Sequence, residues 1–360
     1  MHIKRLRLKS FRNYADQTLE FSPLTNLIYG NNAQGKTNIL EAVYLFAQGR
    51  SHRAKTDREL IKFGSDAARL TLEFSDSSRD YTADMRIAKN GRKAININHV
   101  PIIKLSKLMN YLNVVMFSPE DLDLVKGSPY YRRRFIDSSI SQLYPSYLAA
   151  LMEYNKVLEQ KNSLLKALRA RGASGDPTLS VWNESLAEAG ARIMMARMEF
   201  TERINAAAGT VQSDISNERL GIRYVPSIKC ESVTKNDIFE YLSARERRET
   251  ELGSSQYGIQ RDDLEIFIND NEAKLFASQG QQRTAALAMK IAQAEYIRDI
   301  KGEYPVLLLD DIMSELDINR RMYLSERIRD KQVLITSTDT DISGGNENVR
   351  LFHIKNGELV

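Results

Sequence analysis

The residues that decide the fold are GNNAQGKT, which run from Gly30 to Thr37. They match the pattern G-x-x-x-x-G-K-[ST], in which two glycines let a loop turn its backbone N–H groups toward phosphate oxygens. The apolar run Asn26–Tyr29 precedes the loop, and an amphipathic helix expected over Lys36–Ala47 follows it. This strand–loop–helix context predicts a nucleotide-binding α/β domain, whereas the alternative is an ordinary glycine-rich turn.

The positions of this loop have separate expected tasks. Lys36 supplies a cation for the β- and γ-phosphates of ATP and takes part in catalysis, and Thr37 supplies a hydroxyl ligand for Mg²⁺. The helix that begins near Lys36 adds its positive N-terminal end. The remaining nucleotide contacts are expected from Gly30, Asn31, Asn32, Ala33, Gln34 and Gly35.

A second motif closes an apolar strand with two acids. Pro305–Leu309 is continuously apolar, as expected in a buried parallel sheet, and Asp310 and Asp311 follow it. The carboxyl edge of such a sheet is where nucleotide sites form. We therefore expect Asp310 to hold Mg²⁺ and Asp311 to orient or deprotonate the attacking water. Adjacent acids also end strands by chance, so the phosphate-binding loop is what makes this motif informative.

A third motif, Ser278–Arg283, opens a helix expected over Ser278–Ile297. A serine at a helix start is by default an N-cap, which accounts for Ser278 but not for the glycine and glutamines after it. The segment resembles the signature motif of the ATP-binding-cassette superfamily. In that superfamily the serine and glycine reach the γ-phosphate of a nucleotide held by the other protomer. The resemblance implies that Ser278, Gly280 and Gln281 contact nucleotide across a dimer.

Several segments together resemble the RecF family of bacterial DNA replication and repair proteins. They occur in family order, and within the last of them Ser314–Asp317 resembles the superfamily's D-loop at the dimer seam. The segments are Lys9–Tyr14, Ser51–Arg53, Phe117–Leu122, Gly127–Phe135, Phe276–Arg283 and Leu309–Asp317. The resemblance implies an ATP-dependent homodimer with a head like that of Rad50 and SMC proteins. It also implies binding to double-stranded or gapped DNA, with RecR and RecO as partners in loading RecA.

Two positions depart from these patterns. Gly258-Ile259-Gln260 stands where the family usually has Gly-Pro-His, so the histidine of the family has no counterpart here. Asp311 stands where many cassette ATPases have glutamate. Its shorter reach is expected to give slow ATP hydrolysis, which suits a switch more than a motor, and the resemblance implies that DNA stimulates this hydrolysis.

The expected architecture is an α/β, two-lobed ABC-type ATPase head with a short helical-hairpin arm. Residues 1–118 and 295–360 would form the ATP-binding lobe, and residues 119–294 the second lobe with the signature motif at 278–283. The arm, at about residues 145–208, is predicted from two heptad-like stripes around the turn Arg169–Pro177. Lys161 occupies a stripe position where an apolar residue is expected. Two ordinary core helices would give the same pattern.

Composition restricts the class of protein. The net charge of +4 permits a nucleic-acid partner without establishing one. The single cysteine, Cys230, excludes a disulfide framework and suits a reducing cytoplasm, where the family's role places the protein at the nucleoid. No apolar run reaches membrane-spanning length, so no membrane partner is expected.

Three charged segments leave alternatives open. Lys4, Arg5, Arg7 and Lys9 put charge on both faces of an N-terminal strand, typical of a phosphate-binding sheet edge or of an edge strand guarded against aggregation. Arg132–Arg134 could contact DNA phosphates or cap the neighbouring helix, and a charge run of this kind is usually a solvated face. Glu120 and Asp121 could sense Mg²⁺ and nucleotide or simply begin a helix.

Other classes of ATP-binding protein share some of these motifs. A transporter motor would need a membrane partner, and a small-molecule kinase has no use for Ser278–Arg283. A nucleotide-gated scaffold that does not hydrolyse ATP is the hardest alternative to separate from a slow ATPase.

Overall fold

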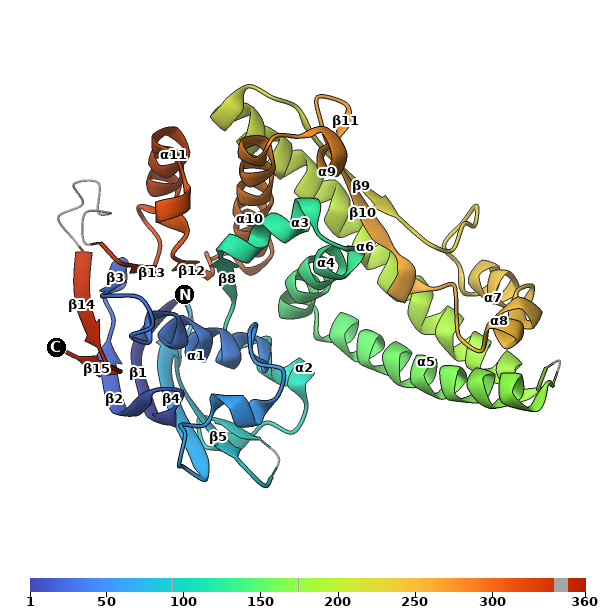
Figure 1. Cartoon of the computed structure of the whole chain (residues 1–360), viewed down its shortest axis with the longest axis horizontal. Coiled ribbons are helices and arrows are strands. Elements are labelled where there is room, and N and C mark those ends of the chain that lie inside the picture. The colour runs from blue at the N-terminus through green and yellow to red at the C-terminus, as the bar shows by residue number, and fades with distance from the viewer. Residues whose placement is uncertain (92, 174, 340–348) are drawn as a thin grey trace. The chain divides into compact units, whose positions relative to one another are not determined.

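A computed structural model describes residues 1–91, 93–173, 175–339 and 349–360, and the chain forms two compact units (Figure 1). The first unit holds Met1–Leu122, Val211–Asn217 and Arg283–Val360, and the second holds Asp123–Thr210 and Glu218–Gln282. These limits differ from the expected 118 and 295, because η2 (Pro119–Leu122) and the part of α10 (Gln279–Lys301) from Arg283 onward belong to the first unit. The expected turn 169–177 and the range 295–360 each include residues outside the described part, namely 174 and 340–348.

The first unit contains a mostly parallel six-stranded sheet in the order β15-β14-β3-β13-β12-β8. Its strands are β3 (Thr25–Tyr29), β8 (Val114–Phe117), β12 (Val306–Asp310), β13 (Val333–Ser337), β14 (Val349–Lys355) and β15 (Glu358–Leu359). Only β15 pairs antiparallel within this sheet. The apolar runs expected at Asn26–Tyr29 and Pro305–Leu309 are therefore buried parallel strands, and both predictions are confirmed.

An antiparallel six-stranded sheet, in the order β2-β1-β4-β5-β6-β7, forms the other layer of this unit. Its strands are β1 (His2–Phe11), β2 (Tyr14–Glu20), β4 (Ala67–Ser75), β5 (Asp80–Ala88), β6 (Ala94–Ile97) and β7 (Val100–Pro101). The core joins the inner faces of both sheets through helix α1 (Lys36–Gln48), which buries Ile39, Val43 and Phe46. Short helices complete the unit: η1 (Asp57–Leu60), α2 (Leu105–Leu108), η2 (Pro119–Leu122), η4 (Ile312–Glu315) and α11 (Ile318–Ile328).

Strand β1 corrects the expectation of a charged sheet edge. It pairs with β2 on one side and β4 on the other, so it is an interior strand. A register shift between Ile3 and Arg5 leaves Lys4 and Arg5 both exposed. Beyond this bulge Arg7 and Lys9 alternate with the buried Leu6 and Leu8, so the basic side chains do not occupy both faces.

The second unit contains the expected helical arm. Helices α5 (Pro145–Arg171) and α6 (Thr178–Ser216) run antiparallel, since Tyr147 hydrogen-bonds Arg197 near one end and Leu165 packs with Leu179 near the other. The predicted hairpin is therefore present. Helix α6 ends in the first unit, because residues 211–217 belong there.

A small antiparallel sheet and further helices complete the second unit. The strands, in the order β11-β10-β9, are β9 (Leu220–Val225), β10 (Asp263–Ile268) and β11 (Asn271–Glu272). The helices are α3 (Asp123–Lys126), α4 (Pro129–Leu143), α7 (Lys235–Ser243), α8 (Glu246–Leu252), η3 (Ile259–Arg261) and α9 (Ala273–Phe276). None of the described helices of the chain is both long and apolar enough to cross a membrane.

Candidate nucleotide-binding site

The loop between β3 and α1 requires its two glycines. Gly30 has φ 146° and Gly35 has φ 113°, backbone conformations that L side chains rarely adopt. A Cβ atom on Gly30 would lie 2.3 Å from the Ile354 carbonyl oxygen, and one on Gly35 would lie 2.5 Å from the Asn13 side chain. The loop therefore has the close-fitting form of a phosphate cradle, in agreement with its sequence pattern.

Residues from the N-terminal hairpin hold the outer side of this loop. The Asn13 amide donates to the Gln34 carbonyl at 2.8 Å, and the Tyr14 hydroxyl donates to the Gly35 carbonyl at 3.0 Å. The Gly357 N–H also donates to the Gln34 carbonyl. These three bonds hold the carbonyls of Gln34 and Gly35, and with them the backbone of the loop, in position.

Lys36 begins α1 and is buried inside the loop. Its Nζ donates to the carbonyls of Gly30 at 2.6 Å and Asn31 at 2.9 Å. Burial lowers the pKa of the Lys36 ammonium, and the carboxylates of Asp311 and Asp310 oppose that shift. A phosphate group would replace two neutral acceptors by charged oxygens, which are stronger partners for an ammonium group.

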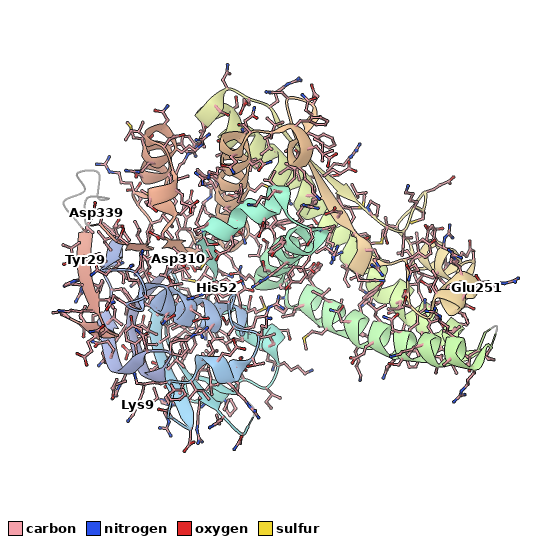
Figure 2. The ribbon with its side chains drawn as sticks, viewed as in Figure 1. Lys9, Tyr29, His52, Glu251, Asp310 and Asp339 are labelled. Atoms are coloured by element: carbon pink, nitrogen blue, oxygen red, sulfur yellow. The ribbon has the colours of Figure 1, made fainter. Side chains whose placement is uncertain are left out.

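Thr37 meets Asp310 at the carboxyl end of the parallel sheet, where Figure 2 labels Asp310. Asp310 Oδ1 accepts hydrogen bonds from Thr37 Oγ1 at 2.8 Å and Thr336 Oγ1 at 2.7 Å. Burial raises the pKa of the Asp310 carboxyl, and the two threonine hydroxyls partly offset the shift. A hydroxyl and a carboxylate at this distance fit Mg²⁺, which typically takes one or two protein oxygens together with phosphates and water.

Thr336 is a site residue that the sequence patterns did not identify. It ends β13, which lies beside β12, and its hydroxyl also accepts a hydrogen bond from the Asp311 N–H at 3.0 Å. The sequence held one indication of this role: Thr336 ends a predicted strand, and the carboxyl ends of parallel strands are where nucleotide sites form.

Asp311 has a left-handed backbone with φ 52°. Asp and Asn adopt this region more readily than longer side chains. The Ser314 hydroxyl donates to the Asp311 carbonyl at 2.8 Å, so the D-loop segment is tied back to this residue. The carboxylate is half-buried and within electrostatic range of Lys36, as a group that orients water beside the phosphates should be.

Residues 278–282 of the signature motif belong to the second unit, whereas Arg283 and Lys36 belong to the first. Ser278 is exposed and forms a reciprocal capping box: the Gln281 N–H donates to Ser278 Oγ at 3.2 Å, and the Ser278 N–H donates to Gln281 Oε1 at 2.8 Å. The Gln281 amide also donates to Glu218. The N-cap role of Ser278 is confirmed, and its contact with a second protomer's nucleotide stays a prediction, as does any contact of Gly280.

Helix α10 contacts two segments of the first unit, one that contains Asp121 and one that contains Glu315. Arg283 donates to the Glu315 carbonyl at 3.0 Å, and Lys290 pairs with Asp121 at 3.6 Å. Asp121 also accepts the Ser118 N–H at 2.8 Å, and burial raises the pKa of its carboxyl. Asp121 therefore has a local structural role.

Two other expected segments meet on α1. Arg12 forms a two-bond ion pair with the fully buried Glu41, at 2.7 and 2.8 Å, and Ser51 donates to the same carboxylate at 2.5 Å. Burial and the bonds from Arg12 and Ser51 act in opposite senses on Glu41, and its pKa is lowered overall. The segments Lys9–Tyr14 and Ser51–Arg53 thus brace the helix that carries Lys36.

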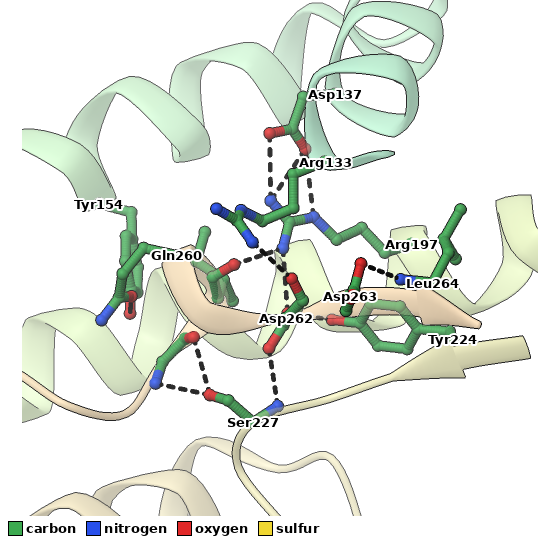
Figure 3. A network of polar contacts seen from close by, with 12 residues as sticks. Arg133, Asp137, Tyr154, Arg197, Tyr224, Ser227, Gln260, Asp262, Asp263 and Leu264 are labelled. Atoms are coloured by element: carbon green, nitrogen blue, oxygen red, sulfur yellow. Dashed lines mark hydrogen bonds and ion pairs between the residues drawn. The ribbon is translucent and has the colours of Figure 1, made fainter. Parts of the chain in front are cut away.

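A buried polar network in the second unit explains other residues singled out in the sequence (Figure 3). Arg197 pairs with Asp137 at 2.9 Å and with Asp262 at 3.0 Å. Gln260, at the position of the family's histidine, accepts from the Tyr154 hydroxyl at 2.7 Å and donates to the Tyr257 carbonyl at 2.8 Å. An amide can donate and accept at once, as a neutral histidine can, so it can serve as a bridge here.

The arginines of the segment Arg132–Arg134 include structural side chains. Arg132 is buried and pairs with Asp263 at 2.6 Å, and Arg133 donates to the Asp262 carbonyl at 2.8 Å. The DNA-contact alternative is therefore wrong for Arg132, whose guanidinium is fully engaged inside the unit.

Comparisons with known proteins agree with this geometry. Residues 2–359 match the family model described as RecF/RecN/SMC N terminal domain. The chain is 40% identical over 363 residues to the DNA replication and repair protein RecF of Clostridium novyi (strain NT), covering 100% of this chain and 99% of that protein. The chain belongs to the RecF family. The resemblance predicted from its motifs is confirmed.

Solved structures of the family have the same fold. The structure of the recombination mediator protein RecF-ATPrS in the RecFOR pathway superimposes with a TM-score of 0.92 at 36% identity, covering 99% of this chain and 97% of that one. An Smc head bound to the C-winged helix domain of ScpA superimposes with a TM-score of 0.60 at 17% identity. The second likeness concerns the fold alone, and it confirms the predicted SMC-like head.

Proposed function

We propose that this protein is an ATP-dependent, DNA-binding switch of DNA replication and repair. The observation that carries the proposal is the 2.8 Å hydrogen bond between Thr37 and Asp310 at the mouth of the Gly30–Thr37 loop. It puts a hydroxyl, a carboxylate and a phosphate cradle in one place. The names of the family relatives support DNA replication and repair as the setting.

ATP acts in this proposal as an adhesive between two protomers. The Gly30–Thr37 loop and Lys36 bind the phosphates, and Thr37 and Asp310 hold Mg²⁺, which neutralises phosphate charge. Ser278 of a second protomer completes the site, with its helix N-terminus directed at the γ-phosphate. Asp311 orients the attacking water, and hydrolysis slowly separates the dimer.

The closed dimer binds double-stranded or gapped DNA. RecR and RecO are the proposed protein partners, supported by the RecFOR pathway named for the structural relative, and RecA loading at gaps is the proposed outcome. The protein would act at the nucleoid, where its substrate lies. Slow turnover would make the ATP-bound dimer long-lived, and stimulation of hydrolysis by DNA would link its separation to DNA binding.

Light scattering with ATP, ADP or no nucleotide, with and without duplex DNA, tests this proposal. We expect a dimer only with ATP and Mg²⁺. Lys36→Ala removes charge-assisted hydrogen bonds worth roughly 1.5–3 kcal/mol each, so ATP affinity should fall at least about tenfold and the dimer should no longer form. Unchanged ATP binding by Lys36→Ala in calorimetry would reject the assignment. A dimer that forms equally with ADP would reject the switch.

A further inference from the structure

Three basic side chains form a row across the outer face of the antiparallel sheet. Lys9 of β1 lies directly opposite Arg69 of β4, and Arg69 lies directly opposite Arg86 of β5. All three are exposed, and Figure 2 labels Lys9 on this sheet. Because neighbouring strands lie about 4.8 Å apart, the row spans roughly 10 Å.

Acids in the part of the chain that the structure describes balance the charge of this row only in part, since the carboxylate of Asp16 interacts electrostatically with Lys9. Asp16, opposite Lys9 on β2, is engaged in two hydrogen bonds with Arg7, at 2.9 and 3.0 Å. Asp84 accepts from Thr71 at 2.8 Å. Within the described residues, none of the three row side chains has a hydrogen bond or an ion pair.

Such an arrangement is unfavourable for the sheet by itself. Like charges directly opposite one another destabilise an antiparallel pair, and this row contains two such pairs in succession. Elsewhere on the same face the basic residues have acidic partners, as Arg5 has Glu73 at 3.5 Å. A negatively charged ligand would offset the repulsion.

The row borders a groove of about 450 Å³ whose lining favours a polyanion. The lining includes Arg7 together with the row, against a single acid, Asp84. It has no aromatic side chain, whereas proteins that bind single strands usually stack bases on aromatic rings. Arginine and lysine without stacking partners are typical contacts to a phosphate backbone.

We propose that the Lys9–Arg69–Arg86 row binds the phosphate backbone of duplex DNA. The proposal rests on the proposed function and adds where on the molecule DNA is held. Each cation binds one phosphate, so the interaction is independent of base sequence and weakens with salt.

The triple variant Lys9→Gln, Arg69→Gln, Arg86→Gln tests the row. With ATP and Mg²⁺ present, duplex affinity is measured by fluorescence anisotropy over a salt series. The slope of log K against log salt should become smaller in magnitude by about 2.7 for each protomer whose row contacts the duplex, at roughly 0.9 for each phosphate that the variant no longer neutralises. Affinity at low salt should fall at least about tenfold. The melting temperature should be unchanged or higher, because like-charge repulsion is removed.

Two controls separate charge from other effects. Lys9→Arg, Arg69→Lys, Arg86→Lys keeps the charges and should keep the wild-type slope. Lys104→Gln, Lys107→Gln, Lys355→Gln removes the same charge from lysines elsewhere in the first unit, and should change the slope much less.

The outcomes that overturn the proposal are distinct from those that overturn the proposed function. A row variant that binds duplex with the wild-type slope, or that loses only single-strand binding, overturns the row. An equal loss in the Lys104, Lys107, Lys355 variant shows that only net charge matters and also overturns it. A wild-type protein that binds no DNA in any nucleotide state overturns the proposed function, and the row with it.

Discussion

Asp310 shows at the scale of one residue how a functional group costs stability. Its carboxyl is buried at the end of β12, and burial raises its pKa above that of an exposed aspartic acid. The folded state therefore favours the protonated form. The stability associated with this proton is fully present below the unfolded value, about 3.9, and is lost as pH rises through the higher folded pKa. At neutral pH the carboxylate destabilises the protein until a cation arrives.

Replacing Asp310 by Asn should therefore stabilise the protein without metal. The amide oxygen can still accept from Thr37 and Thr336, but no charge is buried. We expect a higher melting temperature at pH 7 without Mg²⁺, on the scale of about 1 kcal/mol, and no difference from wild type below about pH 4. Mg²⁺-ATP should no longer raise the melting temperature. A variant that Mg²⁺-ATP stabilises like wild type would contradict the role of Asp310.

The matched control is Asp311→Asn. Asn tolerates the left-handed backbone at this position, so the fold should be unchanged. This variant should keep stabilisation by Mg²⁺-ATP but lose turnover, because an amide cannot act as a base. Wild-type turnover in Asp311→Asn would assign the catalytic role to another group.

Site residues that belong to one sequence motif could be predicted from the sequence. Site residues that approach one another only because their strands are neighbours in the sheet could not. Lys36, Thr37 and Asp310 follow from local patterns with a known geometry. Thr336 reaches Asp310 only because β13 lies beside β12, which the chain order does not reveal. Likewise, the bracing of the phosphate-binding loop by Asn13 and Tyr14 depends on contacts between elements far apart in sequence.

At the scale of elements, periodicity predicts strands and helices but not their neighbours. β1 was expected at a sheet edge, yet it is interior, because pairing on both sides is a non-local property. The bulge at Lys4 also shifts the alternation, which made the charges look two-sided in the sequence. The arm was predicted correctly since two long helices joined by a short turn pack most simply as an antiparallel pair.

A buried ion pair explains why a lysine, Lys161, stands at a position of the heptad-like stripe where an apolar residue is expected. Lys161 of α5 pairs with Glu249 of α8 at 2.5 Å, and both side chains are fully buried. Glu249 Oε1 also accepts from the Gln256 N–H at 2.7 Å and from Ser255 Oγ at 2.9 Å. The pair fixes α8 against the arm, and a partner 88 residues away could not be identified from a heptad pattern.

Breaking this pair on one side should unfold the second unit more easily. Lys161→Met leaves Glu249 buried without its cation, which should cost roughly 3–5 kcal/mol. Lys161→Met with Glu249→Gln should recover most of the loss, since the neutral amide keeps an acceptor for Gln256 and Ser255. Urea unfolding followed by circular dichroism measures both. Equal stability of the two variants would show that the charge is not what the pair contributes.

At the scale of the whole molecule, the motifs fall in different compact units. The Gly30–Thr37 loop, Asp310 and Asp311 belong to the first unit, and Ser278 and Gly280 belong to the second. Ser278 is exposed at the start of α10, and Leu275 and Phe276 just before it are also exposed, at 66% and 72%. An exposed helix N-terminus beside apolar side chains is consistent with a surface that a second protomer covers on ATP binding.

Ser278→Asp separates the cap from the interaction across the dimer. Aspartate is as good an N-cap as serine, so α10 should start normally, but its charge repels a γ-phosphate. We expect ATP binding by the monomer to be nearly unchanged and ATP-induced dimerisation to be abolished. Ser278→Asn, a neutral cap, is the control and should dimerise.

Mixing Lys36→Ala with Ser278→Asp makes the test stricter, because in a mixed dimer both lesions fall in one composite site and the other site is intact. Partial recovery of ATPase activity on mixing supports the shared site. If Ser278→Asp dimerises with ATP like wild type in light scattering, Ser278 is a helix cap and nothing more.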